Sequence, residues 1–163
     1  MSTAATTAER MIRIEHERTF TTSVERGFSI ITDLANWPLY WPGLLRVEPE
    51  SRWCEPGDQA RLILRLLSRE VELAMTLRDF VPNQLVVYDS VQTGLPSARH
   101  ERHFRRVEGG FSYRIVVEYE PRTKIRGLVD RTVLRRGINR AVEETMNNLE
   151  RVLGSASQPT ESS

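Results

Sequence analysis

Hydrophobic and polar residues alternate over much of the chain, and the pattern begins at residues 12–20. Ile14 and Phe20 fall on one side of this segment, whereas Arg13 and Glu15 fall on the other. A period of two indicates a β-strand with one buried face. Similar alternation, or a short apolar run between turn residues, predicts six further strands at 45–53, 60–66, 70–78, 85–91, 99–106 and 111–119. We therefore expect an antiparallel sheet of about seven strands with one apolar face.

Two short helices are predicted between the first and second strands. Val24, Phe28 and Ile31 follow helical spacing, which predicts a helix over about residues 24–32. A second short helix is expected directly after it, at residues 34–40, where Asp33 can act as its N-cap.

The last predicted element is a long helix over about residues 125–153, followed by Gly154 where a helix stop is expected. Its apolar residues stand three, four or six positions apart: Leu128, Leu134, Ile138, Val142, Met146, Leu149 and Leu153. Such a helix can cover the apolar face of the sheet. The predicted fold class is therefore α+β, a curved antiparallel sheet around a long C-terminal helix.

Composition excludes several classes of function. The chain has 163 residues, of which 39% are hydrophobic and 28% charged, and these values fit one globular domain. A net charge of +1 gives no reason to expect a nucleic-acid partner. Cys54 is the only cysteine, so neither an internal disulfide nor a Cys/His zinc site is expected. We expect no metal and no cofactor.

The composition of individual segments bears on membrane association and on the bounds of the domain. No apolar run is long enough to cross a bilayer, so we expect no integral membrane association, and a cytoplasmic location fits the cysteine usage. Residues 1–10 and 154–163 are small and polar, which predicts disorder at both ends of a single domain over residues 11–153. The domain is expected to be a monomer or a homodimer.

One segment resembles a known family. Residues 32–42 read TDLANWPLYWP, which is similar to the Asp-x-x-x-Trp-Pro signature of the START/Bet v 1-like (SRPBCC) superfamily, in its bacterial polyketide cyclase/dehydrase-like branch. The order of predicted elements over residues 12–153 also resembles the helix-grip fold of that superfamily. The resemblance implies a cavity between sheet and helix that holds a lipid, a polyketide or a similar hydrophobic molecule. Because this fold carries many functions, the resemblance does not identify the ligand.

Ligand-binding candidates are the residues expected to face this cavity. An aromatic cluster in the short helices could stack on a flat ligand or simply fix those helices to the sheet, and for Trp37 we favour the second role. The methionines could adapt to an irregular ligand or form ordinary core. The candidates are Trp37, Tyr40, Trp41, Leu64, Met75, Phe104, Ile138, Val142 and Met146.

The strand at 99–106 is unusually polar. If Phe104 faces inward, His100 and Arg102 share its face by strand parity. There they could bind a carboxylate or enolate, and the histidine could move a proton near neutral pH. The alternative is a solvent-exposed face, and a shift of one residue would instead turn His103 inward.

Other polar residues fall on predicted apolar faces. Parity places Asp79 and Asp89 inward, where paired carboxylates could act in acid–base chemistry, although such residues more often lie in water at strand ends. His16 is expected inward as a hydrogen-bonded core histidine. The hydroxyl of Tyr113 could reach the cavity, which makes it the third weak catalytic candidate beside His100 and Arg102.

Three functions remain open at this point. The leading hypothesis is the binding of a hydrophobic small molecule, because the sequence contains no P-loop, GxGxxG, HExxH or Ser/His/Asp motif. The second is a polyketide aromatase/cyclase that catalyses aldol cyclisation and dehydration. The third is a protein-interaction module, which a large exposed apolar patch would favour.

Overall fold

The computed structural model describes residues 11–49, 52–66, 68–92, 96–120 and 131–155. Seven strands form one antiparallel sheet in the order β1-β7-β6-β5-β4-β3-β2, so consecutive strands from β2 to β7 pair with each other and β1 closes onto β7. The strands are β1 (Ile12–Phe20), β2 (Leu44–Pro49), β3 (Gln59–Leu66), β4 (Arg69–Val81), β5 (Leu85–Val91), β6 (Ala98–Val107) and β7 (Gly110–Tyr119).

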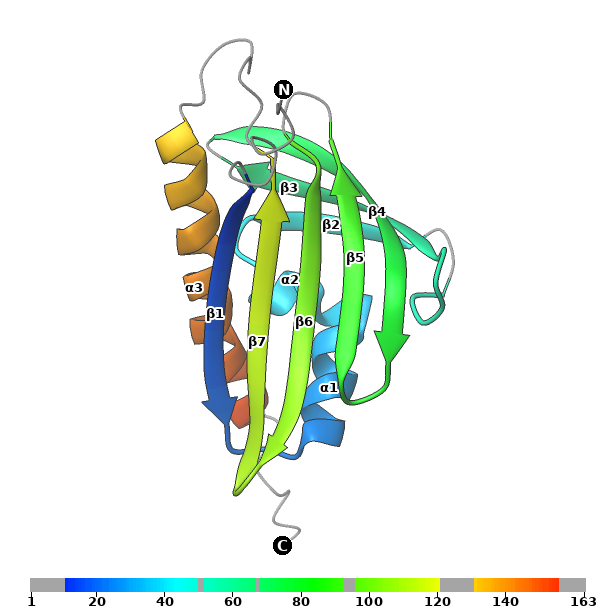
Figure 1. Ribbon diagram of the computed structural model, residues 1–163, viewed down its shortest axis with the longest axis vertical. Helices are drawn as coiled ribbons and strands as arrows, with labels where there is room; N and C mark the ends of the chain where they lie inside the picture. The colour runs from blue at the N-terminus through cyan, green and yellow to red at the C-terminus, as the bar shows by residue number, and fades with distance from the viewer. Residues whose placement is uncertain (1–10, 50–51, 67, 93–95, 121–130, 156–163) are drawn as a thin grey trace, which may run out of the picture.

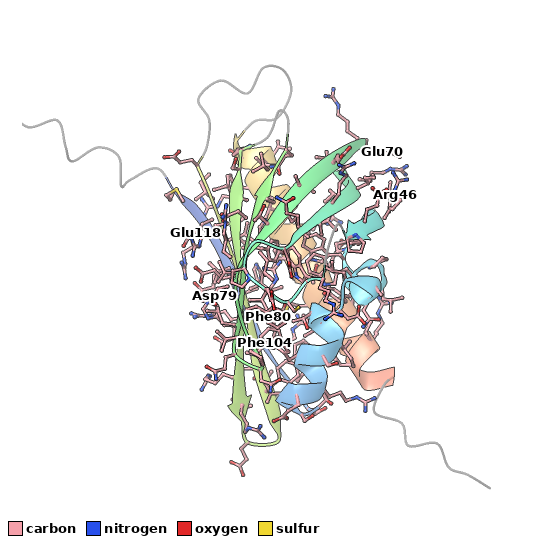
Figure 2. All side chains as sticks on the ribbon, turned by 90° about the vertical axis from the view of Figure 1, so that its right-hand side faces the viewer. Arg46, Glu70, Asp79, Phe80, Phe104 and Glu118 are labelled. Atoms are coloured by element: carbon pink, nitrogen blue, oxygen red, sulfur yellow. The ribbon has the colours of Figure 1, made fainter. Side chains whose placement is uncertain are left out.

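The helices all lie on one side of this sheet (Figures 1 and 2). They are α1 (Val24–Thr32), the 3-10 helix η2 (Leu34–Asn36), α2 (Trp37–Tyr40) and the long α3 (Arg131–Ser155). Figure 1 shows α3 running along the β1 side of the molecule, while β2, β3 and β4 cross at an angle to β1, β7 and β6. The sheet is therefore curved around α3, and the helix-grip fold is confirmed.

Side-chain caps begin α1 and η2, and the cap at Asp33 is the one that the sequence predicts. Ser23 Oγ accepts a hydrogen bond from the Arg26 amide at 3.2 Å, and Asp33 Oδ1 accepts one from the Ala35 amide at 3.0 Å. Each cap satisfies an amide that has no partner within its own helix. The predicted start of the long helix near residue 125 lies outside the described residues.

The two faces of the sheet differ as the alternation requires. On the inner face, Phe20 of β1 stacks on Phe111 of β7 with ring centroids 5.4 Å apart. On the outer face, Arg114 pairs with Glu15 at 3.0 Å, and Glu118 lies on the side away from the helices (Figure 2). One face is thus packed and the other carries exposed ion pairs.

The second strand is shorter than the alternation predicts. It ends at Pro49 instead of continuing to Trp53, because Trp53 turns back into the core and is only 9% exposed. There its ring lies 6.2 Å from that of Trp37 and 5.7 Å from that of Tyr88. An apolar residue at the end of an alternating run can thus pack from a loop.

The inward placement of the two aspartates is wrong. A register shift between Leu77 and Asp79 breaks the parity of β4, and Asp79 is exposed. In β5 the inward residues include Tyr88, so its neighbour Asp89 faces outward and pairs with Arg78 at 2.7 Å. These two carboxylates therefore do not form an acid–base pair inside the fold.

Candidate functional site

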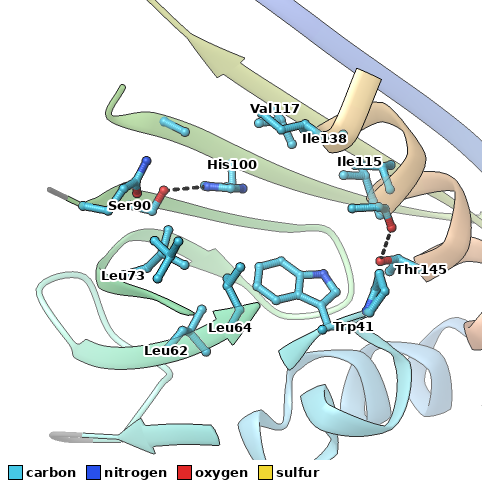
Figure 3. Close-up of a pocket in the computed structure, with 18 of the residues that line it drawn as sticks. Trp41, Leu62, Leu64, Leu73, Ser90, His100, Ile115, Val117, Ile138 and Thr145 are labelled. Atoms are coloured by element: carbon cyan, nitrogen blue, oxygen red, sulfur yellow. Dashed lines mark hydrogen bonds between the residues drawn. The ribbon is translucent and has the colours of Figure 1, made fainter. Parts of the chain in front are cut away.

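A cavity of about 370 Å³ lies between the concave face of the sheet and α3 (Figure 3). Most of its wall is apolar and comes from elements that are distant in sequence. Leu62 and Leu73 approach from β3 and β4, Ile115 and Val117 from β7, and Ile138 from α3. The void exists because a straight helix across a curved sheet cannot fill the whole concave side with its own side chains.

Several predicted ligand contacts lie in this wall. Leu64 comes from β3 and Met75 from β4, whereas Ile138 and Val142 come from successive turns of α3. Trp41 follows α2, and its indole ring is directed toward the space between β3 and α3 (Figure 3). The cavity wall is therefore mainly aliphatic, with Trp41 and Tyr119 as further aromatic contributors.

Two predicted contacts from the short helices lie outside the wall. The indole N–H of Trp37 donates to the carbonyl of Ile31 at 2.9 Å, and the hydroxyl of Tyr40 donates to the same carbonyl at 2.6 Å. Both hydrogen bonds hold α2 against the end of α1. This is the structural role favoured for Trp37.

Two more predicted ligand contacts, Phe104 and Met146, are packed beside the cavity. Phe104 lies 4.8 Å from the ring of Phe28 and 5.0 Å from the ring of Tyr113, in the core that α1 covers. Met146 is 1% exposed and one helical turn beyond Val142, at the part of α3 that packs against α2. The short helices occupy this end of the concave face, so the open space is confined to the other end.

The polar strand β6 turns His100 and Arg102 inward, together with Phe104. His103 faces outward instead, where its Nε2 lies 2.7 Å from Glu101 Oε2. The parity set by Phe104 therefore holds, and the solvent-exposed alternative for His100 and Arg102 is excluded.

His100 is held by two neighbours from β5. Its ring stacks on that of Tyr88, with centroids 4.6 Å apart and planes at 10°. Its Nε2 lies 2.9 Å from the hydroxyl oxygen of Ser90 (Figure 3). Its other ring nitrogen, Nδ1, is buried and has no hydrogen-bond partner among the described residues. One edge of the imidazole is thus fixed, and the other has an unmet hydrogen-bonding capacity.

Burial lowers the pKa of His100 well below its ordinary value, and the positive charge of Arg102 lowers it further. Both causes act in the same direction because each disfavours a cation at this position. At neutral pH the imidazole is therefore uncharged.

Arg102 lies beside His100 in the cavity wall and is 7% exposed. Its Nη2 donates to the Tyr88 hydroxyl at 2.9 Å, and its Nη1 donates to the Glu101 carbonyl at 3.2 Å. The guanidinium carbon lies 5.4 Å from the centroid of the Tyr88 ring. No carboxylate pairs with this cation in the described part of the chain.

Sequence reasoning missed Ser90 and Tyr88, which orient both polar residues. The signal was ambiguous because Val86 and Val87 are both apolar, so the alternation of β5 could be followed in either phase. Register resolves it, since Tyr88 pairs with His100 on the neighbouring strand. Cross-strand neighbours on one face are in contact, which places Tyr88 under the imidazole.

His16 bridges two elements at the edge of the fold. Its Nε2 lies 2.7 Å from Asn139 Oδ1 of α3, and Arg18 donates to Asn147 Oδ1 at 2.9 Å. These contacts tie β1 to α3.

In the described ranges, no helix is both long and apolar enough to span a membrane.

Comparison with solved structures shows the same fold in proteins of low sequence identity. The Zhui aromatase/cyclase from a Streptomyces species superposes with a TM-score of 0.81 at 13% identity, covering 94% of this chain and 99% of that one. A START superfamily protein from Mycobacterium smegmatis has a TM-score of 0.73 at 12% identity, covering 91% and 99%. The di-domain aromatase/cyclase StfQ has a TM-score of 0.71 at 15% identity, covering 87% of this chain and 50% of that one.

No curated protein matches the sequence significantly. The family model described as polyketide cyclase/dehydrase and lipid transport matches residues 11–154, which is nearly the whole chain. The chain therefore belongs to the polyketide cyclase/dehydrase and lipid transport family.

Proposed function

We propose that this protein binds a small, mostly apolar molecule in the cavity between the sheet and α3. The observation that carries the proposal is the cavity itself, about 370 Å³ with a mainly apolar wall. This volume is at the lower end of the roughly 300–1,000 Å³ typical of small-molecule sites. The occupant is accordingly a compact molecule of one to a few rings, or a short acyl chain.

A neutral apolar fluorophore, N-phenyl-1-naphthylamine, tests this proposal. We expect saturable binding to the wild-type chain and a roughly tenfold or greater loss in an Ile138→Trp variant, because the larger side chain fills the cavity. Val133→Trp is the matched control, since Val133 is an exposed residue of the same helix. Absence of saturable binding, or equal affinity in both variants, would contradict the proposal.

Ring-forming catalysis is a second candidate, and the inward pair of His100 and Arg102 favours it. A neutral imidazole can take a proton from a carbon between two carbonyls of a poly-β-ketone. Arg102 can stabilise the enolate oxygen that forms. The enolate carbon then attacks another carbonyl of the same chain, the new alkoxide takes a proton, and loss of water completes the aldol dehydration.

Product analysis with a reactive poly-β-ketone tests the second candidate. We expect the wild-type chain to shift the distribution of cyclised products, and a His100→Ala/Arg102→Ala variant to return it to the spontaneous one. Arg105→Ala on the outer face of the same strand is the control. An unchanged distribution with the wild-type protein, or full activity in the double variant, would exclude this role for the pair.

A further inference from the structure

Arg102 is the only Asp, Glu, Lys or Arg side chain that is buried in the described part of the chain. Ion pairs such as Arg78–Asp89 and Arg61–Glu72 lie at the surface. A buried cation is costly to desolvate unless an opposite charge and hydrogen bonds compensate it. The position therefore raises the question of what neutralises this charge.

No residue in the described ranges neutralises it. The two hydrogen bonds of Arg102 go to a tyrosine hydroxyl and a main-chain carbonyl, both uncharged acceptors. Burial raises the pKa of Tyr88 and of Tyr113, so neither supplies a phenolate near neutral pH. A guanidinium has five N–H donors, so two hydrogen bonds leave others for a ligand.

The position of Arg102 makes its charge available to a ligand. Its side chain borders both the main cavity and a much smaller space of about 10 Å³ beneath Trp37 and Tyr40. It thus stands at the end of the mainly apolar cavity that the short helices close, beside His100, whose Nδ1 has no hydrogen-bond partner among the described residues. This pair is a polar corner where an apolar molecule could place one polar group.

The charged side chains that border the cavity indicate how many negative charges a ligand should carry. His100 is uncharged at neutral pH, so it adds nothing to the charge of Arg102 inside the cavity. At the rim, Arg140 and Glu144 pair with each other at 3.5 Å, and Arg65 is exposed to solvent. Among the described residues, the interior therefore carries a single positive charge, which one negative charge on a ligand would balance.

We propose that the natural occupant is a mainly apolar carboxylic acid whose carboxylate pairs with Arg102 at the closed end of the cavity. The planar guanidinium matches the geometry of a carboxylate, and their hydrogen bonds are strengthened by charge. The imidazole of His100 lies next to Arg102 in the same cavity wall. This inference rests on the proposed binding function and specifies its ligand class.

A pair of ligands of equal shape isolates the charge. The probes are 2-naphthoic acid and 2-naphthamide, measured by isothermal titration calorimetry with the full chain at neutral pH. We expect the wild-type protein to bind the carboxylate roughly tenfold or more tightly than the amide. Because the two probes differ only in the polar group, the ratio reports the contribution of the negative charge.

Three variants assign that preference to Arg102. Arg102→Met, which keeps the length of the side chain without its charge, should bind acid and amide about equally. Arg102→Lys should keep part of the preference for the acid. Arg105→Met on the outer face of the same strand should keep all of it. Circular dichroism checks that each variant folds, and the wild-type ratio decides the question if Arg102→Met does not.

The outcomes separate this inference from the binding function. Equal wild-type affinities for acid and amide, or an unchanged preference in Arg102→Met, would overturn the carboxylate assignment and leave apolar binding intact. Tighter binding of 2-naphthyl phosphate than of the acid would overturn it too, because the site would then prefer a dianion. If neither naphthyl probe nor the neutral fluorophore binds, both proposals fail.

Discussion

At the scale of single residues, the uncharged state of His100 links the polar corner to the stability of the fold. The folded pKa of this group is depressed, whereas in the unfolded chain it returns to about 6.5. Between these two values the unfolded chain binds more protons than the folded one, so stability rises with pH and falls on acidification.

The first prediction concerns this pH dependence. Between about pH 7.5 and 5.5 the free energy of unfolding should fall as His100 in the unfolded chain becomes protonated, by up to about 1.4 kcal/mol per pH unit below pH 6.5. Urea denaturation at several pH values measures it. In a His100→Gln variant the slope over the same range should be clearly smaller, and an unchanged slope would contradict the prediction.

A second residue-scale feature is the backbone of Gly43 at the cavity mouth. Its φ is +76°, a conformation that favours glycine, and an added Cβ would meet the carbonyl oxygen of Arg65 at 2.5 Å. The carbonyl of Gly43 in turn accepts a hydrogen bond from the Arg65 amide at 2.7 Å. The turn after α2 is therefore held against β3 with no room for a side chain.

The second prediction follows from this contact. Gly43→Ala should lower the free energy of unfolding by more than about 1–3 kcal/mol, because a steric clash adds to the backbone strain. Gly57→Ala is the control, since Gly57 has a φ of +96° and an added Cβ would meet no atom within 4 Å, so only the strain applies. Chemical denaturation compares the two variants, and equal losses would show that the clash is relieved.

At the scale of elements, α3 has two parts with different roles. The change from one part to the other falls within a single helical turn. Val142 borders the cavity, whereas Met146 is packed in the core, and the Asn148 side chain on the next turn donates to the carbonyl of Tyr40 at 3.0 Å. The helix thus forms the roof of the cavity in its first half and part of the solid core in its second.

The third prediction separates these halves by truncation. Met146→Ala should cost about 2–5 kcal/mol of stability, because it opens a new void in a packed region. Val142→Ala should cost less, because this side chain already borders empty space, and it should alter probe affinity more. Urea unfolding and fluorophore titration of both variants provide the comparison. A larger stability loss at Val142 would be inconsistent with the division of the helix.

Sequence patterns predicted some features of the strands correctly and others incorrectly. Alternation predicts most of the strands, because most have one buried face, and the parity of β6 follows from Phe104. It fails in β4, where the register shift at Leu77 changes the phase, and in β5, where adjacent valines hide the phase. The stacking of Tyr88 on His100 depends on register between strands, which no single segment contains.

At the scale of the whole molecule, a curved sheet, a long helix and short helices at one end leave space at the other. The family and the order of elements could be predicted from residues 32–42 and the periodicities. The extent of the cavity could not, because it depends on how far α1 and α2 fill the concave face. Tyr40, Phe104 and Met146 are residue types that often line pockets. In this structure they lie in the part of the concave face that the short helices fill.

The fourth prediction belongs to this scale. A ligand that binds only the folded chain stabilises it by about 2.7 kcal/mol at a free concentration of 100 times its Kd. For a domain of this size the melting temperature should then rise by roughly 5–10 °C. N-phenyl-1-naphthylamine is itself fluorescent and interferes with scanning fluorimetry. Differential scanning calorimetry in the presence of this probe therefore measures the shift in melting temperature. Ile138→Trp should show little change, and an equal rise in that variant would place the binding elsewhere.

The grouping of the tryptophans has a practical consequence. The chain has three, and Trp37 lies 5.3 Å from Trp41 and 6.2 Å from Trp53 by ring centroids. Their ultraviolet emission therefore originates at one spot beside the chamber, and one of these rings forms part of its wall. A guest molecule that absorbs in the near ultraviolet should quench that emission by energy transfer, which makes the unlabelled protein an optical sensor of its own occupancy.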